Sequence, residues 1–317
     1  MDSTGCTPVH SPILVTKHLA AGAVLRDDRA RCDYERVSAS GSFPLRQRLW
    51  VSDTLSFVDP QPELSPFDRL FLQAEPAVLN QQHKRETPPV NGGRWPVSVV
   101  LFPEPTIAMA LGQVMEEALQ LAGPGHFHTG LAGSSHFTVR ALEYYRDDVG
   151  PDDAEIVRYR RAMQLAASRC RPVALNVTGL TLTLGSVMAT AKPADEEADR
   201  FMDALREELG QDAWLEADFR RDIWYLNVLH FANDIAYPDR LVEWVKERRD
   251  LDLGVAHADR AHLVRFRYDD ANGRPFMRPE ILGEAVLAAA GDAAAAAVDG
   301  SACAVRLASD PVGGARP

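Results

Sequence analysis

The sequence has few cysteines, and it lacks the sequence patterns of several common enzyme classes. Its four cysteines, Cys6, Cys32, Cys170 and Cys303, form no Cys-x-x-Cys pair and have no histidine at zinc-ligand spacing. We therefore expect reduced thiols, no metal site and no cofactor. The G-x-x-x-x-G-K-S/T loop of P-loop enzymes and the G-x-S-x-G elbow of α/β-hydrolases are both absent, so neither chemistry is expected.

Long apolar runs are also missing. The first residues, MDSTGCTPVH, lack the basic start and the apolar stretch of a secretory signal. The most apolar late segment, 281–298, is mostly alanine and is interrupted by Glu284 and Asp292, so it is too weakly hydrophobic to span a bilayer. We expect a cytoplasmic protein with no membrane partner.

Positive charge is scarce in this chain of 317 residues. Lysine and arginine number 34 against 45 aspartate and glutamate residues, which gives a net charge of −11. A protein that follows the phosphates of a long nucleic acid usually has a basic excess, so we expect no extended nucleic-acid surface. A local basic pocket for a small anion is compatible with this charge. The balance favours a small substrate over a polymer.

The chain divides into three parts by composition. Residues 1–93 hold two short strand candidates, 13–15 and 48–51, then a proline-rich stretch that excludes long regular elements, and finally the turn Asn91-Gly92-Gly93. Regular apolar periodicity begins at Trp95, and the chain is rich in alanine from about 285. The composition therefore predicts an N-terminal extension at 1–93, a folded domain at 94–284 and an alanine-rich tail at 285–317.

Periodicity within the central part predicts alternating strands and helices. The expected strands are 97–102, 136–142, 173–177, 180–190, 223–231 and 262–268, with a turn at Gly179. The expected helices are 107–121, 156–168, 195–209 and 240–249. Mixed elements in this order are typical of an α+β domain built from two similar lobes.

Two strand segments each carry a histidine, His136 in Ser-Ser-His-Phe-Thr-Val and His230 in Asn-Val-Leu-His-Phe-Ala. Burying an imidazole without a partner costs free energy, so a core strand is an unfavourable place for one. Either histidine alone is more simply a satisfied structural residue. Because two such strands carry histidines in similar contexts, the pattern indicates an acid–base pair that faces one cleft.

Strand alternation extends the first of these sites. Side chains at i, i+2 and i+4 share a face of a strand, so His136, Thr138 and Arg140 are expected to project together and to form a wall for an anion. Thr138 is equally well explained as a β-branched strand residue, and Arg140 as an exposed strand end. His230 shares its face with Val228 and Ala232, so the second wall is poorer.

The tetrapeptide His-Phe-Thr-Val at 136–139, followed by a second strand histidine, resembles the 2H phosphoesterase superfamily, relatives of bacterial 2′-5′ RNA ligase and of RNA 2′,3′-cyclic phosphodiesterases. The order of elements over 95–282 is similar as well. The resemblance implies two lobes of antiparallel sheet with helices packed outside and a cleft between them. It also implies that His136 and His230 transfer protons, that Thr138 binds a phosphate oxygen, and that no metal is required.

One residue departs from the pattern of that superfamily. Ala232 stands where the second motif has threonine or serine, and loss of one such donor costs about 10²–10³ in rate at comparable sites. The expected activity is cleavage of a 2′,3′-cyclic phosphate of a nucleotide or short RNA end. Two alternatives stay open: a specialised biosynthetic enzyme that uses both histidines on a non-nucleotide substrate, and a nucleotide-binding module that has lost catalysis.

A weaker candidate site is His126-Phe-His128, whose spacing fits a metal, although no carboxylate follows it. A loop that leads into the first motif is the simpler interpretation. The oligomeric state cannot be predicted from the sequence.

Overall fold

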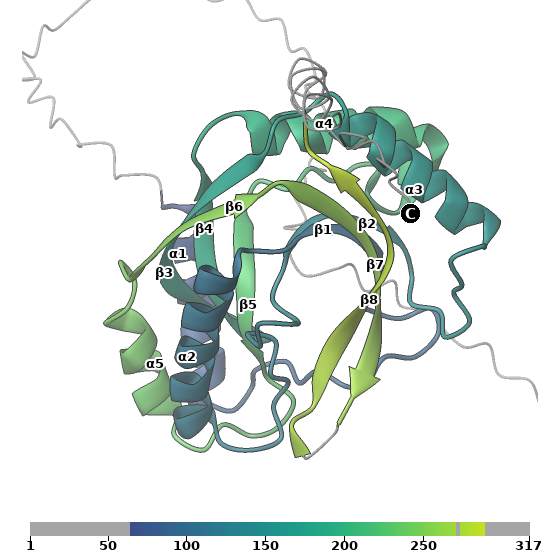
Figure 1. Ribbon diagram of the computed structural model, residues 1–317. Coiled ribbons are helices and arrows are strands. Elements are labelled where there is room, and N and C mark those ends of the chain that lie inside the picture. The colour runs from purple at the N-terminus through teal and green to yellow at the C-terminus, as the bar shows by residue number, and fades with distance from the viewer. Residues whose placement is uncertain (1–63, 271–272, 289–317) are drawn as a thin grey trace, which may run out of the picture. The chain divides into compact units, whose positions relative to one another are not determined.

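Eight β-strands form the body of the protein in the computed structural model, which describes residues 64–270 and 273–288 (Figure 1). In chain order these strands are β1 (Val97–Leu101), β2 (Phe137–Glu143), β3 (Val173–Thr183), β4 (Ser186–Pro193), β5 (Trp224–His230), β6 (Asp252–Ala258), β7 (Arg260–Asp269) and β8 (Phe276–Val286). They form two antiparallel sheets, one in the order β2-β1-β7-β8 and one in the order β5-β4-β3-β6. The α+β class with two antiparallel sheets is therefore confirmed.

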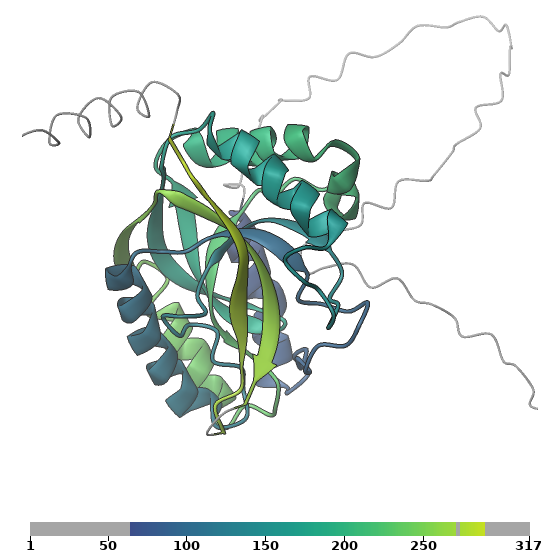
Figure 2. The same cartoon turned by 45° about the vertical axis from the view of Figure 1, so that its right-hand side comes forward.

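The helices pack on the outer sides of these sheets. They are α1 (Pro66–Leu79), α2 (Pro105–Ala122), α3 (Ala154–Ala167), α4 (Glu197–Leu209) and α5 (Pro238–Lys246), with a short 3₁₀ helix, η1 (Gly210–Glu216), after α4. Helices α1, α2 and α5 contact strands of the second sheet, and α3 contacts β7 and β8 of the first. Figure 2 shows α3 and α4 together at one end of the molecule and α2 beside α5 at the other. None of the described helices is both long and apolar enough to cross a membrane.

Helix α4 illustrates why these segments are helical. Its apolar side chains recur at helical spacing, and five of them are buried: Ala198, Phe201, Met202, Leu205 and Leu209. Asp195 accepts a hydrogen bond from the backbone nitrogen of Glu197 at 2.9 Å, so it satisfies a free N–H at the start of the helix. One buried stripe and one satisfied terminus are sufficient to direct this segment onto the sheets.

The described fold begins before the predicted domain boundary at residue 94. Helix α1 lies within the predicted extension, and its Phe67 carbonyl accepts a hydrogen bond from Thr181 Oγ1 of β3 at 2.9 Å. The backbone nitrogen of Glu86 donates to the Phe231 carbonyl at 2.6 Å. At the other end, Leu287 is buried and its nitrogen donates to the Asp259 carbonyl at 2.8 Å. The three-part division stays a prediction, and the strand candidates 13–15 and 48–51 and the tail after 288 lie outside the described residues.

The expected turn at Gly179 is wrong. Strand β3 runs through this residue, and the hairpin to β4 turns at residues 184–185. Gly179 instead forms an irregularity in the β3–β4 pairing, with φ of 78° and its nitrogen donating to the Leu251 carbonyl at 2.6 Å. An added Cβ would lie 1.9 Å from the Arg249 carbonyl oxygen, so glycine is needed for close backbone approach and not for a turn.

This geometry predicts that Gly179→Ala is destabilising. The substitution combines a left-handed backbone conformation with a clash against a main-chain oxygen, and we expect a loss of about 1–3 kcal/mol in the free energy of unfolding. Denaturant unfolding followed by circular dichroism measures it. Gly133→Ala is the control, since an added Cβ there meets nothing within 4 Å. Equal stability of the two variants would contradict the assignment.

Candidate active site

The two predicted histidines lie at corresponding places in the two sheets. His136 immediately precedes β2, an edge strand of the first sheet, and His230 is the last residue of β5, an edge strand of the second. His230 is also paired with Phe127, whose backbone nitrogen and oxygen exchange hydrogen bonds with it at 3.0 and 3.1 Å. His230 is therefore held at its strand end by main-chain pairing, a rigid position for a functional side chain, and His136 adjoins Phe137, the first paired residue of β2.

A cluster of aromatic rings joins the two histidines. The ring of His136 lies 5.0 Å from that of Phe266, which lies 5.7 Å from Trp95, and Trp95 lies 5.2 Å from His230, measured between centroids. A positive charge on His136 lowers the pKa of His230, so the two imidazoles are also within electrostatic range of each other. The fold thus brings together the two residues that the sequence pattern pairs.

His136 is half-buried, and its hydrogen bonding determines where its proton lies. Its Nδ1 lies 2.7 Å from the carbonyl oxygen of Ser134. A carbonyl oxygen only accepts, so Nδ1 donates and the Nε2 atom of the neutral ring carries a lone pair. Burial lowers the pKa of His136 below its ordinary value, against the effect of the Ser134 carbonyl, and the charge of Arg221 lowers the pKa further.

His230 is more deeply buried, with 5% of its surface exposed. Its Nδ1 lies 3.3 Å from the hydroxyl oxygen of Thr129. Burial places the pKa of His230 well below its ordinary value of 6.5, and the charges of Arg94, His136 and Lys84 act in the same direction. Both lowered pKa values favour the neutral imidazoles at pH 7.

Three cations near the histidines were not predicted from the sequence. Lys84 and Arg94 come from the segment between α1 and β1 and act on His230, while Arg221 precedes β5 and acts on His136. Arg94 pairs with Glu86, and Arg221 Nη2 lies 2.5 Å from Glu216. An acidic protein thus has a basic neighbourhood at this site. No local motif marks these residues, because they converge from distant parts of the chain.

Arg140 does not share the face of β2 on which Thr138 lies, although His136, Thr138 and Arg140 were expected to project together. Thr138 is opposite Val100 of β1, but Arg140 is opposite Val99, because β2 carries a bulge between them. Residues paired across a ladder point to the same side of the sheet. Since Val99 and Val100 are neighbours and point to opposite sides, their partners Arg140 and Thr138 also point to opposite sides. The shared-face expectation is wrong for Arg140, since the bulge inserts one extra residue.

Arg140 is buried and bonded to main chain instead. Its Nη2 donates to the carbonyl oxygens of Ala213 and Glu216 at 3.0 and 2.8 Å. These bonds connect η1 to β2. They thereby also fix Glu216, whose carboxylate pairs with Arg221. Arg140 therefore helps to fix the position of η1.

The second motif is held by a different histidine. His126 is fully buried, its Nδ1 accepts from the backbone nitrogen of Ala232 at 3.1 Å, and its Nε2 lies 3.1 Å from the Ala122 carbonyl. Both ring nitrogens are engaged, so the His126-Phe-His128 spacing does not present this ring to a metal. In the described ranges 64–270 and 273–288 no group of three or more histidine, cysteine, aspartate or glutamate side chains has the arrangement of a metal site.

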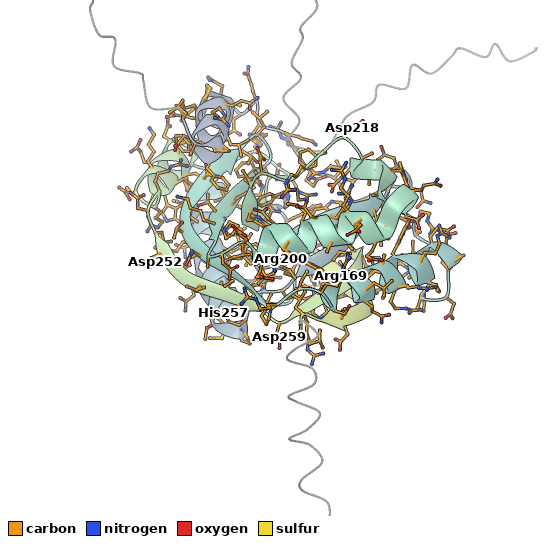
Figure 3. The ribbon with its side chains drawn as sticks, turned by 90° about the horizontal axis from the view of Figure 1, so that it is seen from above. Arg169, Arg200, Asp218, Asp252, His257 and Asp259 are labelled. Atoms are coloured by element: carbon orange, nitrogen blue, oxygen red, sulfur yellow. The ribbon has the colours of Figure 1, made fainter. Side chains whose placement is uncertain are left out.

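A separate pocket of about 390 Å³ lies at the outer surface between α3 and α4. It is lined by Arg169, Cys170, Arg200, Asp203, Ala204 and Glu207, none of which belongs to the histidine site. Figure 3 shows Arg169 and Arg200 near each other on this side. Their guanidinium groups pair with acids, Arg169 with Glu207 at 3.1 Å and Arg200 with Glu197 at 3.6 Å. These pairs neutralise the positive charge of both arginines.

Comparison with solved structures gives distant matches. No protein-family model and no curated protein matches the chain. The apo structure of LigT from E. coli is 13% identical, with a TM-score of 0.39, over 64% of this chain and 99% of that chain. The LigT complex with 3′-AMP is 12% identical, with a TM-score of 0.38, over 63% of this chain and 99% of that chain.

The cations of the site predict how its histidines titrate. In Arg94→Gln the pKa of His230 rises, because a positive charge that opposes protonation is removed and the carboxylate of Glu86 is left without its partner. NMR titration of the imidazole signals measures the shift. Arg200→Gln, at the outer pocket, is the control and leaves His230 unchanged (Figure 3). An unchanged or lower pKa of His230 in Arg94→Gln would contradict this electrostatic account.

Proposed function

We propose that this protein is a phosphoesterase that cleaves a 2′,3′-cyclic phosphate of a nucleotide or short RNA end. The proposal rests on one observation above all, that His136 and His230 border the same aromatic cluster from separate sheets. Neither Nε2 atom has a hydrogen-bond partner within the part of the chain that the structure describes. Two such imidazoles can move two protons, which is the requirement for breaking a phosphodiester.

The chemistry needs one proton acceptor and one proton donor. One imidazole takes a proton from water, whose oxygen bonds to phosphorus, while the bond from phosphorus to the ribose oxygen breaks and that oxygen takes a proton from the other imidazole. Negative charge that develops on the phosphoryl oxygens is stabilised by the Thr138 hydroxyl and by the cations Lys84, Arg94 and Arg221. Arg140 supports this set through η1.

A nucleotide-binding module without catalysis is the second candidate. The observation in its favour is at Ala232, which has no hydroxyl and whose backbone N–H is already used by His126. The second motif therefore offers the phosphate neither of the donors that a serine or threonine motif would provide. Such a module would bind a cyclic nucleotide and release it unchanged.

Substitution of the histidines separates these candidates. For a phosphoesterase, His136→Ala and His230→Ala each lower kcat for 2′,3′-cyclic AMP by about 10²–10⁴, because each removes one proton transfer. Chromatography of the nucleotide product measures the rate, and His257→Ala on β6 is the control (Figure 3). Nucleotide binding without turnover in the wild type would favour the binding module, and equal turnover in all variants would refute two-histidine catalysis.

The hydroxyl of Thr138 gives an independent test. Thr138→Val keeps the β-branched shape in β2 but removes the donor to the phosphate, so kcat should fall by about 10²–10³. Thr138→Ser keeps the hydroxyl and should retain most of the activity. Steady-state kinetics with the same cyclic nucleotide compares the two. Equal loss in both variants would show that the packing of this strand matters and the hydroxyl does not.

A further inference from the structure

Thr129 lies beside the Nδ1 atom of the His230 ring. Backbone hydrogen bonds hold the residues on both sides of Thr129 against β5. Phe127 and His230 exchange two of them, and the Gly130 nitrogen donates to the Val228 carbonyl at 2.8 Å. An added Cβ on Gly130 would lie 3.0 Å from the Val228 oxygen, so the segment lies close against the strand. Thr129 itself is 4% exposed, and its Oγ1 lies 3.3 Å from His230 Nδ1.

The two catalytic imidazoles therefore have different kinds of partner at Nδ1. The Ser134 carbonyl can only accept, which leaves a lone pair on Nε2 of neutral His136. A threonine hydroxyl can donate as well as accept. Within the described part of the chain the Thr129 hydroxyl has no acceptor other than His230 Nδ1, and a buried hydroxyl hydrogen without an acceptor is costly. Donation from Thr129 puts the proton of neutral His230 on Nε2.

We propose that these two partners assign the proton-transfer roles, with His136 as the general base, neutral His230 as the general acid, and Thr129 as the positioning residue that holds His230 in its Nε2–H tautomer. This assignment rests on the proposed phosphoesterase function. It explains how a site in which neither imidazole is charged can carry out both proton transfers. A neutral histidine has an established role as a proton donor or electrophile at buried sites.

The proton balance closes over one turnover. Water gives one proton to Nε2 of His136, and its oxygen forms the new bond to phosphorus. The leaving ribose oxygen keeps the electron pair of the broken bond and takes the proton from Nε2 of His230. His136 then loses its extra proton to solvent and His230 regains one. Lys84 and Arg94, whose charges disfavour an imidazolium at His230, favour the negative charge that develops on this ring as it donates.

The tautomers can be observed directly on unliganded, full-length protein. Nitrogen-15 NMR at pH 7 distinguishes protonated from unprotonated ring nitrogens, and His136→Gln and His230→Gln assign the signals. We expect a protonated Nδ1 in His136 and a protonated Nε2 in His230. A protonated Nδ1 in neutral wild-type His230 would overturn the proposal, whether or not the protein proves to be a phosphoesterase.

Kinetics test the role of Thr129. Thr129→Val has nearly the same shape but cannot donate, so we expect the Nε2–H signal of His230 to lose intensity and kcat to fall about 10–100-fold, as is common when the partner that orients a ring is removed. KM stays within a few-fold, since Thr129 does not touch substrate, and Thr129→Ser restores kcat. Thr181→Val is the matched control, because it loses a buried hydroxyl that bonds to the Phe67 carbonyl and to Arg249 and to neither histidine.

The pH dependence separates this assignment from an imidazolium acid. When both rings act in the neutral form, kcat/KM of the wild type falls as pH drops through the two lowered pKa values and is level above them. A decline of kcat/KM as pH rises above 6.5 would overturn the proposal, as would full activity in Thr129→Val. Wild-type protein without any turnover would refute the phosphoesterase function instead, while the NMR spectrum would still decide the tautomer of His230.

Discussion

The paired backbone hydrogen bonds between Phe127 and His230 are the interaction on which the rest of the site depends. They attach the segment that follows α2 to β5, an edge strand of the second sheet, although α2 itself follows β1 of the first sheet. One such attachment places His126 against the backbone of Ala232, Thr129 against the imidazole of His230, and Phe127 in the aromatic cluster. Without it, the second histidine would stand at an exposed strand end, where water would hold its pKa near the usual value.

Electrostatics at the site run opposite to the charge of the whole protein. The chain has a net charge of −11, and at the outer pocket between α3 and α4 its arginines pair with carboxylates. Around the histidines, burial and three cations all act to keep the imidazoles uncharged. Under the proposed function the same cations would attract an anionic substrate and stabilise charge on its oxygens, so neutral imidazoles and phosphate chemistry are compatible in one place.

Most of the strands and helices could be predicted from local sequence patterns. Helices α2 and α4 carry their apolar residues at helical spacing, and β5 carries its apolar residues at the alternating spacing of a strand. The same reasoning failed in the proline-rich stretch, which was expected to exclude long regular elements but holds the 14-residue helix α1, with Pro66 in its first turn. It failed at two further places as well. Gly179 was expected to form a turn, but a backbone approach from Arg249 requires a glycine within β3. Arg140 was expected to face the anion, but a bulge in β2 turns it to the other side. In both cases a partner distant in sequence decided the outcome.

The sequence by itself placed Thr138 and His230 in strands and His136 at a strand start, one residue before β2 in the structure, because alternation and motif spacing are local properties of the chain. It also showed the departure at Ala232. The tertiary structure alone decided which groups surround the pair, namely Lys84, Arg94, Arg221 and Thr129. These residues come from connecting segments whose composition carries no periodic signal, and they meet only because the two sheets bury their histidines at one aromatic cluster. Hydrogen-bond partners and charges at atomic distance set the proton states of the two rings, and such distances exist only in the folded chain.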